Sequence, residues 1–234
     1  MANPAFIYRP PQSPYLEFLY QDNDIVVANK PSGLLSVPGK APEHYDSLIS
    51  RINCVFPTAT VVHRLDMATS GVIVLALNKP AHRHLSRQFE TRQTRKRYFA
   101  HVWGSIPDDK GEIDLPLICD WPNRPKQKVD FDSGKPAVTR YEVIQRCENR
   151  TLVALYPITG RSHQLRVHML SLGHPILGDR LYGSEQSRQA ATRLQLHANV
   201  LQLRHPVTNQ LHSFESPLPF SHFTPPPLAL NEQA

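Results

Sequence analysis

The residues best suited to chemistry lie in the stretch 61–77, VVHRLDMATSGVIVLAL, where a polar cluster separates two apolar runs. Arg64 and Asp66 lie in this cluster, and a loop at the edge of a sheet would hold such groups rigidly. An ionised aspartate beside a cation could act as a nucleophile, as a base or as a stabiliser of positive charge. The alternative is a structural ion pair that caps a turn, and the residue types alone favour it.

A second polar segment, residues 156–173, carries four basic or titratable side chains: Arg161, His163, Arg166 and His168. Arginines near the start of a helix provide a site for phosphate or carboxylate. The histidines, together with His63, raise the question of a metal site. They are not accompanied by an acid at a spacing typical of metalloenzymes, so we predict no bound metal.

Two further segments are strongly basic. Residues 79–98 contain Glu90 as their one acid and the following cations: Lys79, Arg83, Arg87, Arg92, Arg95, Lys96 and Arg97. One interpretation is a surface that contacts successive RNA phosphates and leads to Tyr98, whose ring could stack on a base. The other is a charged helix face in solvent, with Tyr98 packed in the core. Residues 119–135 place Trp121 among three cations, Arg124, Lys126 and Lys128, and indicate an exposed basic loop.

The elements that must position these groups are mostly strands. Apolar runs predict strands at 25–28, 71–77 and 97–103. Two hairpins are predicted, one pairing 137–147 with 151–156 and one pairing 195–203 with 211–215. We therefore expect an α+β fold, in which a mixed, mostly antiparallel sheet forms the core and helices pack on it.

Two helices are predicted. The first covers residues 80–92, where Ala81, Leu85 and Phe89 form one apolar stripe beside a basic one. The second begins near Ser162, a good N-cap residue, and ends before Gly173.

Composition narrows the class of protein. The chain has 234 residues, 40% of them hydrophobic, and a net charge of +6, which favours a polyanionic partner. Its three cysteines form no CxxC pair, so we expect neither disulfides nor a thiolate zinc site, and a cytoplasmic location. No apolar run approaches the roughly 20 residues that a membrane helix needs.

Prolines are frequent near both ends of the sequence, and they separate the two ends from the central part. Residues 1–14 are predicted to be an extended N-terminal arm, residues 15–220 one domain, and residues 221–234 a Pro-rich flexible tail. Nothing in the sequence indicates an oligomer, so we expect a monomer.

Four segments occur in an order that matches a known family: NKPSGLLSVPG (29–39), HRLDMATSG (63–71), KRYFAHVWG (96–104) and GRSHQLRVHMLSLGHPILGD (160–179). With these segments the chain resembles the RluA family of pseudouridine synthases. The HRLD-x-x-TSG pattern is the most specific. The segment at 115–128 is similar to family members that act on both ribosomal and transfer RNA. Residues 15–220 would then be the catalytic domain.

The resemblance also implies roles for individual residues. Asp66 matches the catalytic aspartate, Arg166 the arginine that pairs with it, Tyr98 the tyrosine that stacks on the target uracil, and Arg64 the arginine that enters the RNA where the flipped base leaves. Further RNA contacts are expected from six basic residues: Arg83, Arg87, Arg124, Lys126, Lys128 and Arg161.

The implied reaction converts selected uridines of structured RNA to pseudouridine, in a 23S rRNA hairpin loop and in anticodon stem-loops of tRNA. The enzyme would be an isomerase, an intramolecular transferase that flips the base out of its stack. All product atoms are present in the substrate, so we expect no cofactor. Asp66 could attack C1′ to give an acylal-like adduct, or remove a proton from C2′ to give a glycal. Both routes remain open.

Two other functions fit parts of the sequence. An N-glycoside hydrolase also needs a carboxylate beside an oxocarbenium-like centre, but it would release free base. A non-catalytic RNA-binding module would not require a carboxylate, which repels phosphate.

Overall fold

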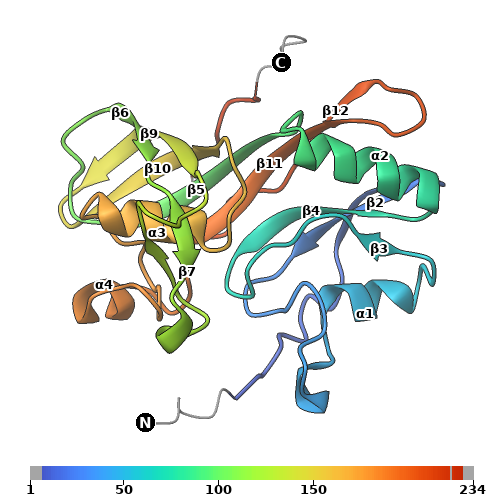
Figure 1. Ribbon diagram of the computed structural model, residues 1–234, viewed down its shortest axis with the longest axis horizontal. Coiled ribbons are helices and arrows are strands. Elements are labelled where there is room, and N and C mark those ends of the chain that lie inside the picture. The colour runs from blue at the N-terminus through green and yellow to red at the C-terminus, as the bar shows by residue number, and fades with distance from the viewer. Residues whose placement is uncertain (1–6, 222, 229–234) are drawn as a thin grey trace.

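In residues 7–221 and 223–228, which the computed structural model describes, ten strands join into one long, mixed sheet (Figure 1). Across the sheet the main path runs β1-β2-β4-β11-β5-β10-β9-β6, while β3 pairs with β4 and β12 with β11. The strands are β1 Phe18–Gln21, β2 Ile25–Lys30, β3 Thr60–Val61, β4 Ser70–Ala76, β5 Arg95–Trp103, β6 Lys110–Asp114, β9 Val138–Cys147, β10 Arg150–Pro157, β11 Leu196–Arg204 and β12 Leu211–Glu215. A separate hairpin pairs β7 Leu117–Cys119 with β8 Gln127–Val129.

The pairing of β4 with β11 joins the two halves of the sheet. It is parallel, with His197 opposite Ser70 and Ala198 opposite Gly71, whereas the other described strand pairs are antiparallel. Gly71 has φ +115°, and a Cβ there would lie 2.1 Å from the carbonyl oxygen of Ala198. Glycine is therefore required at this crossing, both for the backbone angle and for the close approach.

The helices cover both faces of the sheet. They are α1 Leu48–Asn53, α2 Lys79–Glu90, α3 Gln164–Ser171 and α4 Glu185–Gln189, with 3-10 turns η1 Pro42–His44 and η2 Trp121–Asn123. Figure 1 shows α1 and α2 on opposite sides of the half that contains β2 and β4. Residues of β4 alternate accordingly, because Val74 packs with α2 and Ile73 packs with α1.

Two clusters of the core meet at Tyr98. One cluster lies between α1 and strands β2 and β4, and includes Leu65. Another lies under α3, where Leu165 and Met169 pack on β5 and β10. Tyr98 packs against both clusters, so its ring lies where the two halves of the sheet meet.

The predicted fold class is confirmed, and the main predicted strands and both hairpins are present, within a few residues of the expected bounds. The first predicted helix corresponds to α2. It begins at Lys79 because the side chain of Asn78 accepts a hydrogen bond from the backbone of Ala81.

The second predicted helix corresponds to α3, but its predicted cap residue is wrong. Ser162 does not cap α3; the cap position is His163, which adopts the left-handed conformation at φ 54°. No side chain in the described part of the chain caps the start of α3. Gln164 instead orders the turn before the helix, because its Oε1 accepts hydrogen bonds from Arg161 N (3.0 Å) and Thr159 Oγ1 (2.7 Å).

Both ends of the described chain pack on the domain. Tyr8 Oη donates to Asp46 O and accepts from Leu35 N. At the other end Arg97 donates to Pro226 O, and the Phe223 ring packs edge-on against Phe99. Contacts with the domain thus begin at residue 8 of the predicted arm and include residues 223 and 226 of the predicted tail. Residues 1–6, 222 and 229–234 lie outside the described part. No helix in the described residues is long and apolar enough to cross a membrane.

Candidate active site

The loop between β3 and β4, which carries Asp66, is held by the segment that follows β2. Ser36 Oγ donates to Leu65 O (2.6 Å), and Ser32 Oγ donates to Ala68 O (2.6 Å). The backbone of Gly33 donates to Met67 O (2.8 Å). The sequence NKPSGLLS thus forms a clamp on the residues on both sides of Asp66. Such support fixes a catalytic group more firmly than a free loop would.

Lys30 is the buried centre of this clamp. Its ammonium group donates to three carbonyl oxygens, those of Pro31 (2.9 Å), Leu34 (2.7 Å) and Met67 (3.1 Å). Burial lowers the pKa of Lys30 to about 7, while the nearby Asp66 carboxylate opposes the shift. Three acceptors match the three N–H groups of the charged form, so the geometry favours the ammonium ion. Sequence reasoning missed this residue, although a lysine that ends a buried strand was a visible signal.

Arg166 of α3 brings a buried cation to Asp66. Its side chain is 5% exposed and lies 3.4 Å from Asp66, measured from Nη1 to Oδ2. Asp179 anchors it on the other side with two hydrogen bonds, at 2.8 Å to Nε and 2.7 Å to Nη2. Burial works against the charge, but the hydrogen bonds and charge of Asp179 and the charge of Asp66 raise the pKa of Arg166. The guanidinium group is therefore permanently charged and fixed in place.

Asp179 is a second residue that sequence reasoning missed. It is 1% exposed and also accepts hydrogen bonds from the backbones of Leu181 (2.9 Å) and Tyr182 (3.2 Å). A buried arginine needs a buried acid, and the last residue of the motif GHPILGD was the available candidate.

Tyr98 lies close enough to Asp66 for the charge of the carboxylate to act on its phenol. Burial, followed by the negative charge of Asp66, raises the pKa of the Tyr98 phenol, so the ring remains neutral. A neutral aromatic ring between two apolar clusters provides a stacking surface for a flat base.

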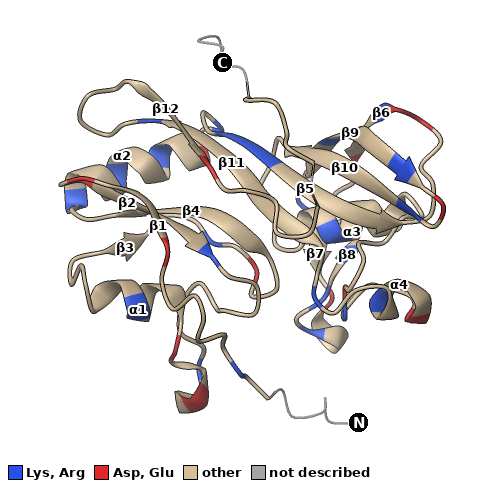
Figure 2. Ribbon diagram, turned by 180° about the vertical axis from the view of Figure 1, so that it is seen from behind, with Lys and Arg blue, Asp and Glu red and all other residues tan. Residues whose placement is uncertain are grey.

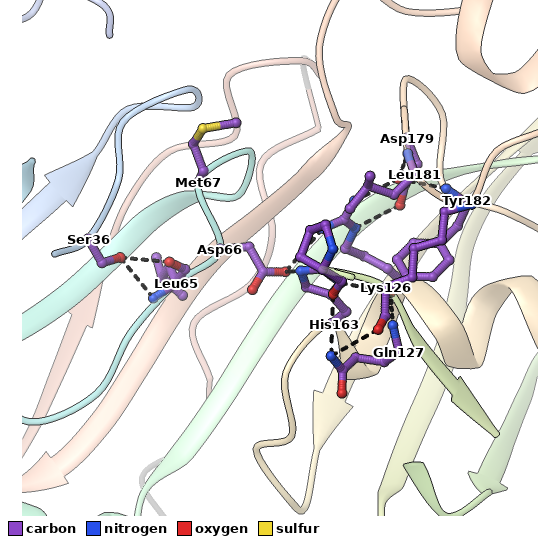
Figure 3. Close-up of polar contacts among 12 residues, drawn as sticks. Ser36, Leu65, Asp66, Met67, Lys126, Gln127, His163, Asp179, Leu181 and Tyr182 are labelled. Carbon is purple, nitrogen blue, oxygen red and sulfur yellow. Dashed lines mark hydrogen bonds and ion pairs between the residues drawn. The ribbon is translucent and has the colours of Figure 1, made fainter. Parts of the chain in front are cut away.

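His163 completes the immediate surroundings of Asp66 (Figure 3). Its Nε2 lies 3.9 Å from Asp66 Oδ2, and its Nδ1 lies 2.7 Å from the hydroxyl of Tyr182. Burial lowers the pKa of His163; the charge of Asp66 opposes this and that of Arg166 adds to it. The imidazole is thus neutral at pH 7.

The arrangement offers one carboxylate that is held but still accessible. The Asp66 side chain remains 27% exposed, whereas its two closest polar neighbours, Arg166 and His163, are 5% and 12% exposed. A carboxylate stabilised on one side by a buried cation and open on the other can approach a sugar carbon that develops positive charge.

The other predicted site residues lie further out. Arg64 is exposed in the same loop as Asp66. Arg83 and Arg87 are exposed on α2, where basic positions recur (Figure 2), and this helix reaches the loop through Phe89, which stacks on His63 at 4.4 Å. Arg161 is partly exposed and donates to Pro136 O.

The predicted basic loop is in part a hairpin, formed by β7, η2 and β8. Arg124 lies over the Trp121 ring at 4.6 Å, and Lys128 pairs with Asp130 at 3.2 Å. Lys126 is half-buried. The hairpin approaches the site through its backbone, because Gln127 N donates to the Tyr182 hydroxyl at 2.7 Å.

The three histidines considered as metal ligands serve other purposes. His63 Nε2 accepts from Val74 N, and His168 contacts Thr139 Oγ1 and Leu115 O. Among the described residues, a group with ligand atoms close together is Asp22, Asp24 and His205. Asp22 in this group already accepts hydrogen bonds from Tyr20 and from two backbone N–H groups.

Comparison with known proteins places these features in a family. A family profile described as RNA pseudouridylate synthase matches residues 24–171. The dual-specificity RNA pseudouridine synthase RluA of Escherichia coli (strain K12) is 59% identical over 214 residues, which are 91% of this chain and 98% of that protein. The enzyme of the same name from Haemophilus influenzae is 55% identical over 210 residues, 89% of this chain and 96% of that protein.

Two solved structures with RNA pseudouridylate synthase in their names resemble the fold of this chain. Human RNA pseudouridylate synthase domain containing 1 superposes with a TM-score of 0.74 at 29% identity, covering 94% of this chain and 88% of that one. Human RNA pseudouridylate synthase domain containing 4 gives a TM-score of 0.71 at 30% identity, covering 87% and 89%.

Proposed function

The chain belongs to the RNA pseudouridylate synthase family, and on this basis we propose that it isomerises uridines in both ribosomal and transfer RNA, with Asp66 as its catalytic carboxylate. The protein is a pseudouridine synthase, an isomerase that acts on RNA. Identity of 59% over nearly the whole length of an enzyme named for dual specificity supports the two classes of substrate.

The pairing of Asp66 with Arg166 is the observation that carries the catalytic assignment. The two residues are 100 positions apart in the sequence, yet Arg166 Nη1 lies 3.4 Å from Asp66 Oδ2. A buried, anchored cation keeps the carboxylate charged and aims it. A protein that merely bound RNA would have no use for a supported carboxylate on the binding surface.

Two neighbours suit the handling of a flipped base. We assign Tyr98 to stacking on the target uracil, because its ring lies at the junction of the two apolar clusters and next to Asp66. We assign Arg64 to the space that the base leaves in the RNA, because it is exposed two residues before Asp66. Base flipping costs a few kcal/mol of stacking, which such a cation can help to offset by hydrogen bonds.

The reaction balances without an added reagent. The N1–C1′ bond of the uridine breaks, the uracil turns and a C5–C1′ bond forms. The proton on C5 is released to water and N1 takes up a proton, so substrate and product have the same composition. Asp66 supports the first step either by bonding to C1′ or by taking a proton from C2′. Both routes place one carboxylate oxygen next to the ribose.

The first test measures tritium release from RNA labelled at uridine C5, with a chelator present. One substrate is a tRNA anticodon hairpin and the other a 23S rRNA hairpin. We expect wild-type protein to release tritium from both and to leave the base attached to the RNA. The variant Asp66→Asn should release none while binding either RNA within about twofold of wild type, because the missing charge is needed for catalysis alone.

Asp108→Asn is the matched control, since it removes one carboxylate from an exposed position. It should behave as wild type in both assays. Substantial turnover by Asp66→Asn would refute the catalytic assignment, and release from one RNA class alone would refute dual specificity. Free uracil among the products would indicate a hydrolase.

A further inference from the structure

A chain of hydrogen bonds links the β7–β8 hairpin to His163. Gln127 N donates to the Tyr182 hydroxyl at 2.7 Å, and this hydroxyl lies 2.7 Å from His163 Nδ1 (Figure 3). Burial raises the pKa of Tyr182 to about 12, so the phenol carries its proton. Its oxygen already accepts from Gln127, and the acceptor in line for its own proton is His163 Nδ1.

A Tyr182 hydroxyl that donates to Nδ1 would fix the tautomer of His163. A neutral imidazole has one N–H, and a ring whose Nδ1 accepts from Tyr182 must carry its proton on Nε2. That nitrogen lies 3.9 Å from Asp66 Oδ2, a gap that a small rotation of either side chain would close. Hydrogen bonds in active sites often tighten in this way when substrate binds.

The two donors near Asp66 lie closest to the same carboxylate oxygen, Oδ2. Arg166 Nη1 and His163 Nε2 both point to Oδ2, at 3.4 and 3.9 Å. Among the residues that the structure describes, none donates to the other oxygen, Oδ1. One oxygen is therefore held by the protein, and the other is left for the substrate.

We propose that His163 is a positioning residue, oriented by Tyr182, whose Nε2–H holds Oδ2 of Asp66 and thereby presents Oδ1 to the ribose. This proposal rests on the proposed function, in which Asp66 is the catalytic carboxylate. The charged and titratable groups that face the imidazole are Asp66, Arg166, Asp179 and Tyr182.

The backbone of His163 supports a role beyond packing. Its φ of 54° is uncommon for a residue other than glycine, although histidine and asparagine tolerate it better than most. Such strain persists where the surrounding structure requires a particular side chain at that point. Here it turns the imidazole of a residue at the start of α3 towards both Tyr182 and Asp66.

Two substitutions of His163 distinguish the role of Nε2 from that of Nδ1. In His163→Gln the side-chain amide reaches the place of Nε2 and can still donate to Asp66. In His163→Asn it reaches only the place of Nδ1. Asparagine also suits the left-handed backbone better than glutamine does. A folding defect would therefore lower the activity of the glutamine variant more, which is the opposite of the expected order.

We expect His163→Asn to lower kcat for tritium release by about 10- to 100-fold, the size of one hydrogen bond to a charged group, with KM within about twofold of wild type. His163→Gln should lower kcat by no more than about threefold. Tyr182→Phe keeps the ring under Arg166 but removes the proton that fixes the tautomer, and should lower kcat about tenfold.

A spectroscopic measurement tests the tautomer without relying on activity. In protein labelled with 15N-histidine, the His163 signals, identified by their loss in His163→Asn, should show a protonated Nε2 and an unprotonated Nδ1. Tyr182→Phe should shift them towards protonated Nδ1. Protonated Nδ1 in the wild type, or equal kcat for the asparagine and glutamine variants, would overturn the proposal. If wild-type protein released no tritium, the proposed function would fail, and the 15N signals would still decide the Tyr182–His163 arrangement.

Discussion

At the scale of single residues, the site depends on how Arg166 is shared between two carboxylates. Asp179 makes both short hydrogen bonds, at 2.7 and 2.8 Å, and is 1% exposed, whereas Asp66 lies 3.4 Å away and remains partly open. The bidentate contact fixes the plane of the guanidinium group. Asp179 is thus the structural partner, and Asp66 is the partner that stays free to react.

This division predicts different stabilities for two similar variants. Asp179→Asn leaves a buried guanidinium group without its close partner and should lower the free energy of unfolding by about 3 kcal/mol or more. Asp66→Asn removes a longer, half-open contact and should cost less than about 1 kcal/mol. Urea unfolding of both variants at pH 7.5 measures the difference. A larger loss for Asp66→Asn than for Asp179→Asn would contradict this account.

At the scale of elements, the sequence predicted what depends on local patterns. The strands around Ile25, Val74 and Phe99, both hairpins and α2 follow from apolar periodicity and turn residues, which a strand or helix carries within itself. Short elements such as β1, β3 and α4 were missed, because a few residues carry too little periodicity.

Features that depend on contacts between distant segments could not be predicted in this way. The roles of Asp66, Arg166, Tyr98 and Arg64 were predicted from motifs and stay predictions. The roles of Lys30 and Asp179 appear only when carbonyl groups or a guanidinium group from other segments surround them. The predicted cap of α3 was wrong for a local reason, since His163 occupies the cap position in a left-handed conformation that residue types alone did not indicate.

The basic face of α2 gives a prediction at this scale. Ala81 and Leu85 are buried against the sheet, which leaves Arg83 and Arg87 exposed. If they contact phosphates, Arg83→Glu and Arg87→Glu should each weaken RNA binding and reduce the slope of log affinity against log salt by about 0.7–0.9. The slope is measured by filter-binding or fluorescence titrations at roughly 50 to 200 mM salt, a range in which phosphate contacts change the affinity strongly.

The control for these two charge reversals is Lys110→Glu. Lys110 is also exposed, but it lies on the edge strand β6. It should leave the salt slope closer to that of wild type. Equal slopes for all three variants would mean that α2 is not part of the RNA surface.

At the scale of the whole molecule, the sheet buries histidines in their neutral form. Burial lowers the pKa of His197 to about 4 and that of His63 to about 3, from an ordinary value of 6.5. Their ring nitrogens are already engaged, His197 with Ser70 and the Ser216 carbonyl group, and His63 with Val74 N. Protonation of His63 would remove the acceptor that Val74 N uses, and protonation of His197 would place a charge in the core.

The consequence is a loss of stability in mild acid. Below about pH 6.5 the unfolded chain binds protons at these histidines while the folded protein does not, so folding stability is full above that pH and declines as the pH falls towards 4. Each histidine contributes about 1.4 kcal/mol per pH unit in this window. Urea unfolding at pH 7.5, 6 and 5 should show the decline.

Calorimetry in two buffers of different ionisation heat provides an independent measure. At about pH 5, unfolding should be accompanied by uptake of roughly two protons from the buffer, bound by His63 and His197. A free energy of unfolding that did not change between pH 7.5 and 5, without proton uptake, would show that these histidines are protonated in the folded state.

The position of β11 determines when activity can first appear during synthesis. This strand, Leu196–Arg204, lies between β4, which follows the Asp66 loop, and β5, which carries Tyr98 (Figure 1). A nascent chain that has emerged only as far as α3 already contains Asp66, Tyr98 and Arg166, but it lacks the strand that joins the two halves. Domains tend to fold as units while translation proceeds from the N-terminus. We therefore expect the enzyme to stay inactive until this late strand has left the ribosome, so that an unfinished chain would not modify the RNA of the ribosome that is making it.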